Sequence, residues 1–198
     1  MKHLQKQVLK DTELVLDDKE LNYLGPNLVV ENCRVVLPRS TRAITISNAQ
    51  FTGCRFQTNT KFKSFHDWCA AELINCSFFG YYEGNDFGYW EEISLKGKIK
   101  GCNFSGAILD GCRFFDCDID SIAFPLWPCF AILNPHRITH QFEATNWPGE
   151  LEHWFGGISF SPKNTLAIVG YAPELVKKYG ASEDELRIIL EQFPEIRL

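Results

Sequence analysis

A five-residue repeat is the feature that most constrains how this chain can fold. A large apolar residue stands at every fifth position, in the order Ile99, Phe104, Leu109, Phe114, Ile119 and Phe124. Two residues before each stands a small residue or a cysteine, in the order Gly97, Cys102, Ala107, Cys112 and Cys117, and then the larger Ile122. Six consecutive units in register are not expected by chance, and a fixed period of this kind is typical of a stacked repeat architecture.

The same unit returns upstream in shorter runs. An Asn or Gly followed by Cys, with Phe or Val two residues after the Cys, begins at Asn32, Gly53, Asn75, Gly101 and Gly111. The first three gaps in this series are 21, 22 and 26 residues. These gaps are close to four pentads plus small insertions, so the pattern predicts coils of about 20 residues with four short faces, stacked about 4.8 Å apart.

Side chains alternate along a strand, so two positions of each pentad should point toward the axis of such a β-helix. The large residue fills the axis, and the small residue two positions earlier lies near the wall, where Leu would not fit. This predicts that six cysteines are buried small residues, namely Cys33, Cys54, Cys76, Cys102, Cys112 and Cys117. The alternative is a metal cluster, but the sequence contains no close Cys-x-x-Cys pair.

Residues 101–124, GCNFSGAILDGCRFFDCDIDSIAF, resemble the pentapeptide-repeat family, whose unit is written A(D/N)LxX. Cys takes many of the Ala places here, and Phe takes many of the Leu places. The resemblance spans about residues 27–125 and is continuous over 97–124. It implies a right-handed, four-sided parallel β-helix. Members of the family include acidic DNA mimics that shield topoisomerases, which have long uninterrupted coils, and others that serve as binding or scaffold modules.

The chain therefore divides into three parts. We expect an N-terminal cap over residues 1–26, a mainly β pentapeptide-repeat-like β-helix over 27–125, and an irregular C-terminal capping segment over 126–198 with one or two helices. A cap is needed because the open end of a β-helix exposes unpaired strand edges.

Two helices are predicted near the C-terminus. Pro173 can occupy the first turn of one helix, and Gly180 can end it. Ser182, with Glu185 three residues later, forms a capping-box pattern that opens the second helix. Two apolar runs, within 126–135 and 165–171, predict strands.

Two insertions interrupt the period, at about 57–69 and 79–92, and loops on a rigid scaffold often carry function. The second insertion is rich in Tyr, Trp and acidic residues and has no Lys or Arg, a composition typical of a contact for a basic protein partner. The alternative is that its aromatic side chains fold back onto the helix wall. The predicted partner-binding residues are Tyr82, Phe87, Tyr89, Trp90, Glu91, Asp116 and Asp118.

Four aspartates between inward positions should form an acidic strip facing solvent, namely Asp110, Asp116, Asp118 and Asp120. Asp116, Asp118 and Asp120 superficially resemble the start of a calcium loop. An EF-hand loop would need Gly at its sixth place and Glu at its twelfth, where this chain has Ser121 and Trp127. A solvated face or an electronegative docking surface explains the strip better.

The formal net charge of −5 creates no field that would attract nucleic acid, but it suits a basic protein partner. The N-terminus has no apolar run typical of a signal peptide, and no stretch of about 18 apolar residues predicts a membrane span. Eight cysteines without an export signal predict reduced thiols and a cytoplasmic location.

The sequence offers no catalytic signature, and we expect neither an enzyme nor a cofactor. His136 and His140 are four residues apart but lack the Glu of a zinc protease motif. Cys69 follows His66 and Cys129 precedes His136, pairs that any chain with eight cysteines and five histidines offers by chance. No phosphate-binding loop or Gly-x-Ser-x-Gly elbow is present.

The plan of a small acidic repeat scaffold, an aromatic loop and a non-repeat cap resembles immunity proteins of bacterial polymorphic-toxin systems. We therefore expect a non-catalytic module that binds and neutralises a toxin with a basic surface, and that binds neither nucleic acid nor membrane. The alternatives are an acidic DNA mimic that protects an enzyme such as a topoisomerase, and a generic scaffold or adaptor.

Overall fold

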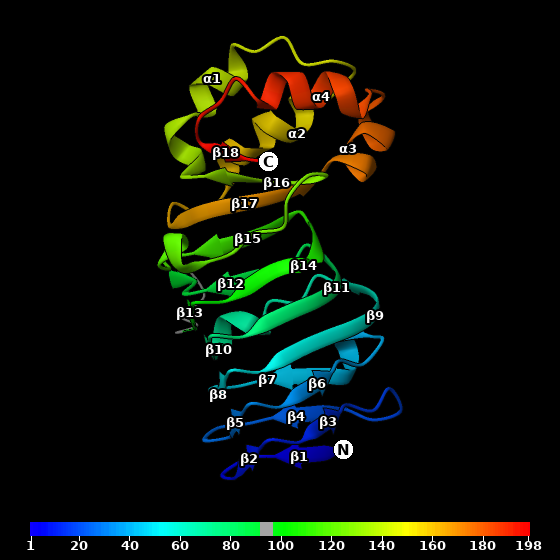
Figure 1. Ribbon diagram of the computed structural model, residues 1–198, viewed down its shortest axis with the longest axis vertical. Coiled ribbons are helices and arrows are strands. Elements are labelled where there is room, and N and C mark those ends of the chain that lie inside the picture. Colours follow the sequence, from blue (N-terminus) through cyan, green and yellow to red (C-terminus); the bar gives the residue numbers. More distant parts are fainter. Residues whose placement is uncertain (92–96) are drawn as a thin grey trace.

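The pentad positions turn toward a common axis. In the computed structural model, which describes residues 1–91 and 97–198, Phe104, Leu109 and Phe114 are wholly buried and Ile99 is 2% exposed. Ile119, near the end of the repeat, is half-buried. The chain forms a parallel β-solenoid covered at one end by a helical cap (Figure 1). The expected β-helix and its inward positions are confirmed.

Each of the first three coils contributes three short strands. Their bounds are β1 (Lys2–Leu4), β2 (Val8–Lys10) and β3 (Glu13–Val15); β4 (Asn22–Leu24), β5 (Val29–Glu31) and β6 (Arg34–Val36); and β7 (Ile44–Ile46), β8 (Ala49–Thr52) and β9 (Arg55–Lys63). The next turns of the chain contain β10 (Ala71–Ile74), β11 (Ser77–Glu83) and β12 (Asp86–Gly88), then β13 (Lys98–Lys100), β14 (Asn103–Asp110) and β15 (Cys112–Phe115). Each coil thus contains three strands, whereas we expected a short strand on each of four faces.

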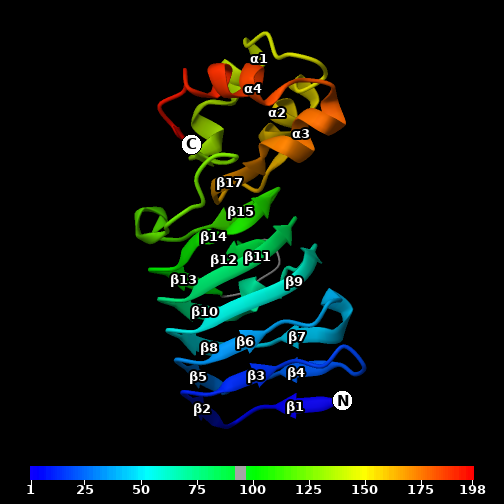
Figure 2. The ribbon, with the colours of Figure 1, turned by 45° about the vertical axis from the view of Figure 1, so that its right-hand side comes forward.

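Equivalent strands pair in parallel along the axis. The orders are β1-β4-β7, β13-β10-β8-β5-β2 and β14-β11-β9-β6-β3 (Figure 2). In the third sheet Arg34 pairs with Arg55, Arg55 with Ser77 and Ser77 with Asn103, steps of 21, 22 and 26 residues. The steps equal the first three motif gaps read from the sequence, so the motifs at Asn32, Gly53, Asn75 and Gly101 mark successive coils.

The Asn or Gly before each motif cysteine turns a corner between two sheets. All five residues of the series have a left-handed backbone, with φ of 54° at Asn32, 63° at Gly53, 53° at Asn75, 64° at Gly101 and 63° at Gly111. Gly reaches this region without steric penalty, and Asn is the residue that tolerates it next best. The corner explains why Asn or Gly stands at this position in the five motifs. In the first coil the equivalent corner residue is Asp11, with φ of 50°.

The two expected insertions are largely strand. Part of 57–69 extends β9, and the rest enters a 3₁₀ helix, η2 (Asp67–Ala70). The segment 79–92 continues β11 and supplies β12, so the loop interpretation is wrong for most of it. Glu92 lies outside the described residues. These longer strands widen one wall of the solenoid, and this is how the chain accommodates residues beyond four pentads.

The segment 1–26, expected as an N-terminal cap, is itself a coil. Its strands β1, β2 and β3 pair in parallel with β4, β5 and β6 of the next coil. It therefore extends three sheets.

The C-terminal segment closes the other end of the solenoid. In the fourth sheet, of order β12-β15-β17-β16-β18, the last three strands are antiparallel to their neighbours. They are β16 (Cys129–Leu133), β17 (Thr165–Tyr171) and β18 (Ile196–Arg197). The helices are α1 (Thr139–Glu143), α2 (Glu152–Gly157), α3 (Ala172–Tyr179) and α4 (Glu183–Leu190). Short 3₁₀ helices are η1 (Thr41–Ala43), η4 (Ile119–Ser121), η5 (Pro135–Arg137) and η6 (Ile158–Phe160).

The predicted strands and helices of this segment are confirmed. Ser182 and Glu185 form the reciprocal capping box that opens α4, and Gly180 ends α3 with φ of 70°. Helices α1 and α2 had no clear signal in the sequence.

Two apolar cores meet at strands β16 and β17. Ala131 and Ala167 face the solenoid core, whereas Ile132 and Ile168 face a second core beneath the helices. Because side chains alternate along β16 and β17, the same two strands contribute residues to both cores. The cap is therefore joined to the solenoid without a linker. Among the described residues, none of the helices has the length and apolar character needed to cross a bilayer.

Candidate protein-docking site

Two of the predicted partner-binding residues lie in the core. Tyr82 and Phe87 are wholly buried, so their assignment to a partner surface is wrong. The Phe87 ring stacks on Trp68 with centroids 5.8 Å apart and on Phe114 at 5.1 Å. The reason is that residues 79–88 form strands, whose alternation sends every second side chain inward.

The other five predicted residues gather near the ends of β12 and β15. Tyr89 and Trp90 are half-buried, whereas Glu91, Asp116 and Asp118 are exposed. We call these five residues the docking edge. The structure brings together Tyr89 and Asp116, which are 27 positions apart in the sequence.

Asn164 ties the docking edge together. Its side-chain amide donates to the carbonyl of Tyr89 at 2.7 Å, and its own carbonyl accepts the backbone N–H of Asp116 at 3.0 Å. The N–H of Tyr89 in turn donates to the carbonyl of Phe115 at 3.2 Å. These bonds fix the backbone of the edge, so its side chains project from a rigid support.

Trp90 lies over the outer face of β15. Its ring centroid is 5.0 Å from that of Phe115 and 5.1 Å from the guanidinium carbon of Arg113. The imidazole of His66 meets the indole edge-on at 6.0 Å. The indole is thereby held by aromatic and cation–π contacts.

A buried carboxylate lies beneath this aromatic layer. Asp86 is 1% exposed and accepts from Arg113 at two points, Nε–Oδ1 at 2.7 Å and Nη2–Oδ2 at 2.8 Å. The Nδ1 of His66 lies 2.5 Å from Oδ2. The sequence did not indicate this cluster, because Asp86 stands among other acidic residues and has no feature that separates it from them.

Three of the four strip aspartates are exposed as expected, but Asp110 is not. Asp116, Asp118 and Asp120 face solvent, and Asp120 pairs with Arg197 at 3.0 Å. Asp110 is half-buried and accepts a hydrogen bond from the hydroxyl of Tyr81 at 2.9 Å. Burial raises the pKa of the Asp110 carboxyl above its usual value.

Asp110 belongs instead to a cleft between the solenoid wall and the cap, which we call the corner cleft. The cleft has a volume of about 550 Å³. Its cationic lining residues are Lys61, Lys63, Lys177 and Lys178. Its acidic lining residues are Glu83, Asp110 and Glu174, and Trp154 supplies an aromatic side. Nothing in the linear sequence indicated it, because its walls come from β9, β11, β14 and helices α2 and α3.

Most of the charge in the corner cleft is matched. Lys61 pairs with Glu174 at 2.8 Å, and Lys63 pairs with Glu83 at 3.1 Å. The ammonium of Lys61 lowers the pKa of the Glu174 carboxyl through this hydrogen bond. The cleft is therefore a hydrated, mixed-charge contact that joins α3 to the wall.

Comparison with protein families, with curated proteins and with solved structures found no match for this chain.

The cysteine thiols lie mostly inside the protein. All eight cysteines are free, and seven of them are buried. Burial raises the pKa of the thiols of Cys69 and Cys112, and it raises the pKa of Cys117 to about 12 and of Cys129 to about 11. In the parts of the chain that the structure describes, no three His, Cys, Asp or Glu residues group in a way that could hold a metal ion.

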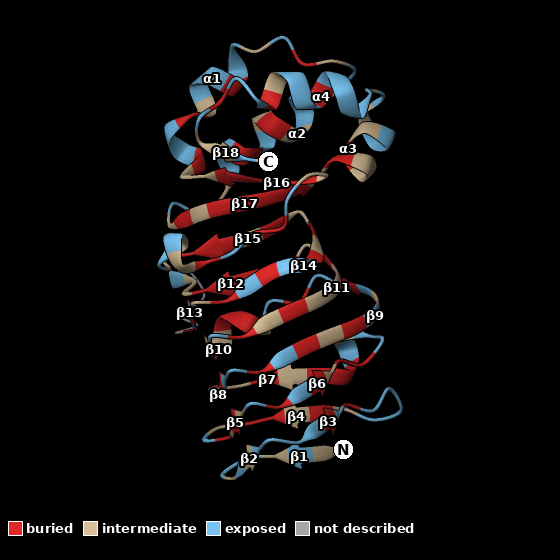
Figure 3. Ribbon diagram, in the orientation of Figure 1, coloured by how far each residue is buried: buried red, intermediate tan, exposed pale blue. Residues whose placement is uncertain are grey.

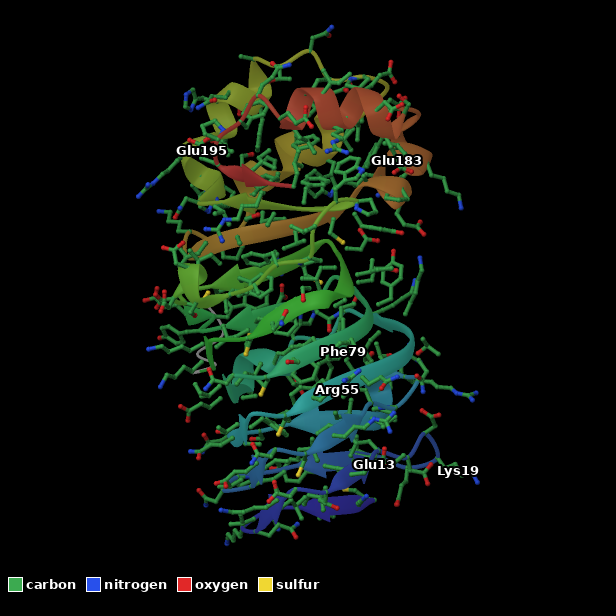
Figure 4. The ribbon with its side chains drawn as sticks, in the orientation of Figure 1. Glu13, Lys19, Arg55, Phe79, Glu183 and Glu195 are labelled. Carbon is green, nitrogen blue, oxygen red and sulfur yellow. The ribbon has the colours of Figure 1, made fainter. Side chains whose placement is uncertain are left out.

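Ion pairs link neighbouring coils on the outer walls. Ion pairs join neighbouring strands at Lys10 and Glu31 (2.7 Å), Glu13 and Arg34 (2.5 Å), and Glu72 and Lys98 (3.1 Å). On the same wall as β9, the guanidinium of Arg55 lies 3.7 Å from the ring centroid of Phe79 (Figure 4). These two walls are thus mixed in charge. Exposed acidic residues occur at the docking edge, in residues 11–20 of the first coil and at the start of α4.

Proposed function

We propose that this protein is a protein-binding module that contacts its partner through the docking edge. The observation that carries the proposal is the gathering of three exposed carboxylates, Glu91, Asp116 and Asp118, beside the half-buried aromatic residues Tyr89 and Trp90. Aromatic anchors with charged neighbours are typical of protein interfaces, where a few such residues supply most of the affinity.

The residues beneath the docking edge hold its side chains in a fixed arrangement. Asn164 bonds both strands of the edge, and Arg113 holds Trp90 from below. A partner that binds here meets side chains already in place, which lowers the entropy lost on binding.

The chemistry of the edge indicates a basic partner surface. Carboxylates at the rim speed association with a positive surface and exclude acidic competitors. Within this class we propose an immunity protein that neutralises a toxin, because the pentad repeats and the non-repeat cap resemble pentapeptide-repeat scaffolds used for that purpose. The mixed charge of the walls gives less support to a DNA mimic, which would need regular acidic spacing down one face.

The proposal is tested with the product of the reading frame beside the gene. We expect the purified protein to bind that product and to relieve its toxicity when the two are produced together. Replacing Tyr89, Trp90 and Glu91 together with Ala should weaken binding at least about 30-fold, since hot-spot residues contribute about 2 kcal/mol or more.

Glu183, an exposed acidic residue on the cap, supplies the matched control: Glu183→Ala should leave the affinity unchanged. A complex that forms equally well with the triple variant would place the contact elsewhere on the solenoid. Failure of the native protein either to bind or to protect would remove the immunity function.

A further inference from the structure

The first coil leaves the edges of three sheets open. Strands β1, β2 and β3 each stand last in their sheet and pair on one side only, with the second coil (Figures 1 and 2). The carbonyl of Gln7 accepts from Val29, and the N–H of Asp11 donates to Glu31. Because backbone groups alternate along a strand, those of Val8 and Lys10 point away from the second coil and form a template for a further strand.

The apolar interior also reaches solvent at this end. Leu4 and Leu9 pack on the solenoid core but are only half-buried, and none of residues 1–10 is fully buried (Figure 3). At the other end, β17 and β16 continue the core and the helices pack over these two strands. Among the described residues, no element packs on the outer side of the first coil. Binding of a partner there would pair its open backbone edges and bury its leucines.

The charges of the first coil are divided between its two halves. Residues 1–10 contain three lysines and no acidic residue. Residues 11–20 contain five acidic residues and one lysine. A coil with one basic half and one acidic half is complementary to a second coil that runs in the opposite direction.

The inward leucines have the same symmetry. Leu4, Leu9 and Leu14 are five residues apart, so Leu9 stands midway between the other two. An antiparallel arrangement centred on Leu9 apposes Leu9 to its own copy and Leu4 to Leu14 of the second copy. It also places Lys6 opposite Thr12 of the second copy, between Asp11 and Glu13.

We propose that the first coil is the interface of a two-fold homodimer, in which two solenoids stack end to end with their first coils antiparallel. Such an interface is self-complementary, as a two-fold axis requires. It pairs the open edges of β1, β2 and β3, covers Leu4 and Leu9, and joins the basic half of each coil to the acidic half of the other. A foreign strand could satisfy one edge, but the second copy satisfies all three and both charge signs.

Sedimentation velocity tests the proposal directly. We expect the 198-residue protein to sediment with twice the mass of one chain, and to dissociate on dilution within the range of about 1 mM to about 10 nM. Purely monomeric sedimentation throughout this range would overturn the proposal. Deuterium exchange gives a second readout, because the amides of Val8 and Lys10 should be protected in the dimer and should exchange freely in a monomeric variant.

A charge exchange tests the antiparallel register. Lys6→Glu should weaken the dimer at least tenfold, because the new carboxylate faces Asp11 and Glu13 of the second copy. Adding Asp11→Lys should restore much of the affinity, since each new Glu then meets a new Lys. The matched control is Lys178→Glu, an exposed reversal on the cap, which should leave the dimer unchanged.

The outcomes separate this inference from the proposed function. A dimer that Lys6→Glu does not weaken, or that Asp11→Lys does not rescue, would overturn the antiparallel arrangement. Leu9→Lys should give a monomer that still binds the partner at the docking edge, since the edge lies at the opposite end of the solenoid. Loss of partner binding with an intact dimer would affect only the proposed function.

Discussion

The guanidinium of Arg113 neutralises the buried carboxylate of Asp86 through two hydrogen bonds of 2.7 and 2.8 Å. Arg113→Leu leaves this carboxylate without its main partner in a site that is 1% exposed. Removing one member of a buried ion pair typically destabilises a protein by about 3–5 kcal/mol. We expect a loss of this size in the free energy of unfolding, measured by urea titration at pH 7.

The matched control replaces both members of the pair. Asp86→Leu combined with Arg113→Met removes both charges and retains side chains of similar volume. Because apolar replacements of a buried pair are often neutral or stabilising, this variant should recover most of the lost stability. Equal losses in the single and double variants would mean that the ion pair does not account for the effect.

Thiol reactivity provides a second prediction. Burial raises the pKa of Cys117 to about 12 and of Cys129 to about 11, so very little of either thiol is ionised at pH 8. We expect the thiols of the native protein to react with a disulfide reagent far more slowly than those of the unfolded protein. In the unfolded protein all eight thiols should react quickly. The half-buried Cys117 should react first. Rapid reaction of several thiols in the native state would contradict the inward placement of the cysteines.

The pentad pattern was enough to predict the solenoid, its inward residues and the length of its coils. Each of these depends on local alternation and on a repeated position, as at Cys54 and Phe56, which are both buried. A periodic sequence carries that information directly. The capping box at Ser182 and Glu185 was readable for the same reason, because its two residues lie within one turn.

The candidate site was predictable only in part. Tyr82 and Tyr89 stood in one apparent loop, and only strand alternation shows that the first is buried and the second is half-exposed. The pairing of Asp86 with Arg113 joins β12 to β15 across 27 positions, and no repeated motif in the sequence aligns these two strands. The corner cleft depends on how the cap docks on the wall, which no local pattern encodes.

The half-buried Asp110 makes stability depend on pH. Burial raises the pKa of its carboxyl in the folded state, so the folded protein holds this proton more tightly than the unfolded chain does. Stability from this group is therefore greatest at low pH and falls as pH rises from about 3.8 through the raised pKa. Asp110→Asn should be more stable than the native protein at pH 7, and the difference should vanish in acid.

The pKa of Glu174 is shifted in the opposite direction from that of Asp110, so a change at Glu174 serves as the control. Its ion pair with Lys61 lowers the pKa of its carboxyl, so its contribution is present above its ordinary pKa and is lost as pH falls. Glu174→Gln should therefore be slightly less stable than the native protein at pH 7, with the difference shrinking in acid. Urea unfolding of the native protein, Asp110→Asn and Glu174→Gln from pH 4 to pH 8 tests both expectations. Parallel curves for the native protein and Asp110→Asn would show that Asp110 titrates normally.

Gly88 sets the position of the docking edge, because β12 ends at this residue and Tyr89 follows it. Its backbone has φ of 95°, and a Cβ atom built there would lie 2.1 Å from the carbonyl oxygen of Phe115. Gly88→Ala must therefore separate β12 from β15 and strain the backbone, at a cost of about 1–3 kcal/mol for the strain alone. Gly156 in α2 has open space around the same atom, so Gly156→Ala should stabilise the protein by up to about 1 kcal/mol.

The two glycine variants should also differ in partner binding. Moving β12 shifts Tyr89 and Trp90 away from Asp116, so Gly88→Ala should weaken binding even at temperatures where it remains folded. Gly156→Ala should bind as the native protein does, because a Cβ atom at Gly156 would have no atom within 4 Å to displace. If Gly88→Ala bound normally while its unfolding midpoint fell, the glycine would serve the solenoid alone. The residues of the docking edge would then tolerate displacement, which a rigid recognition surface does not.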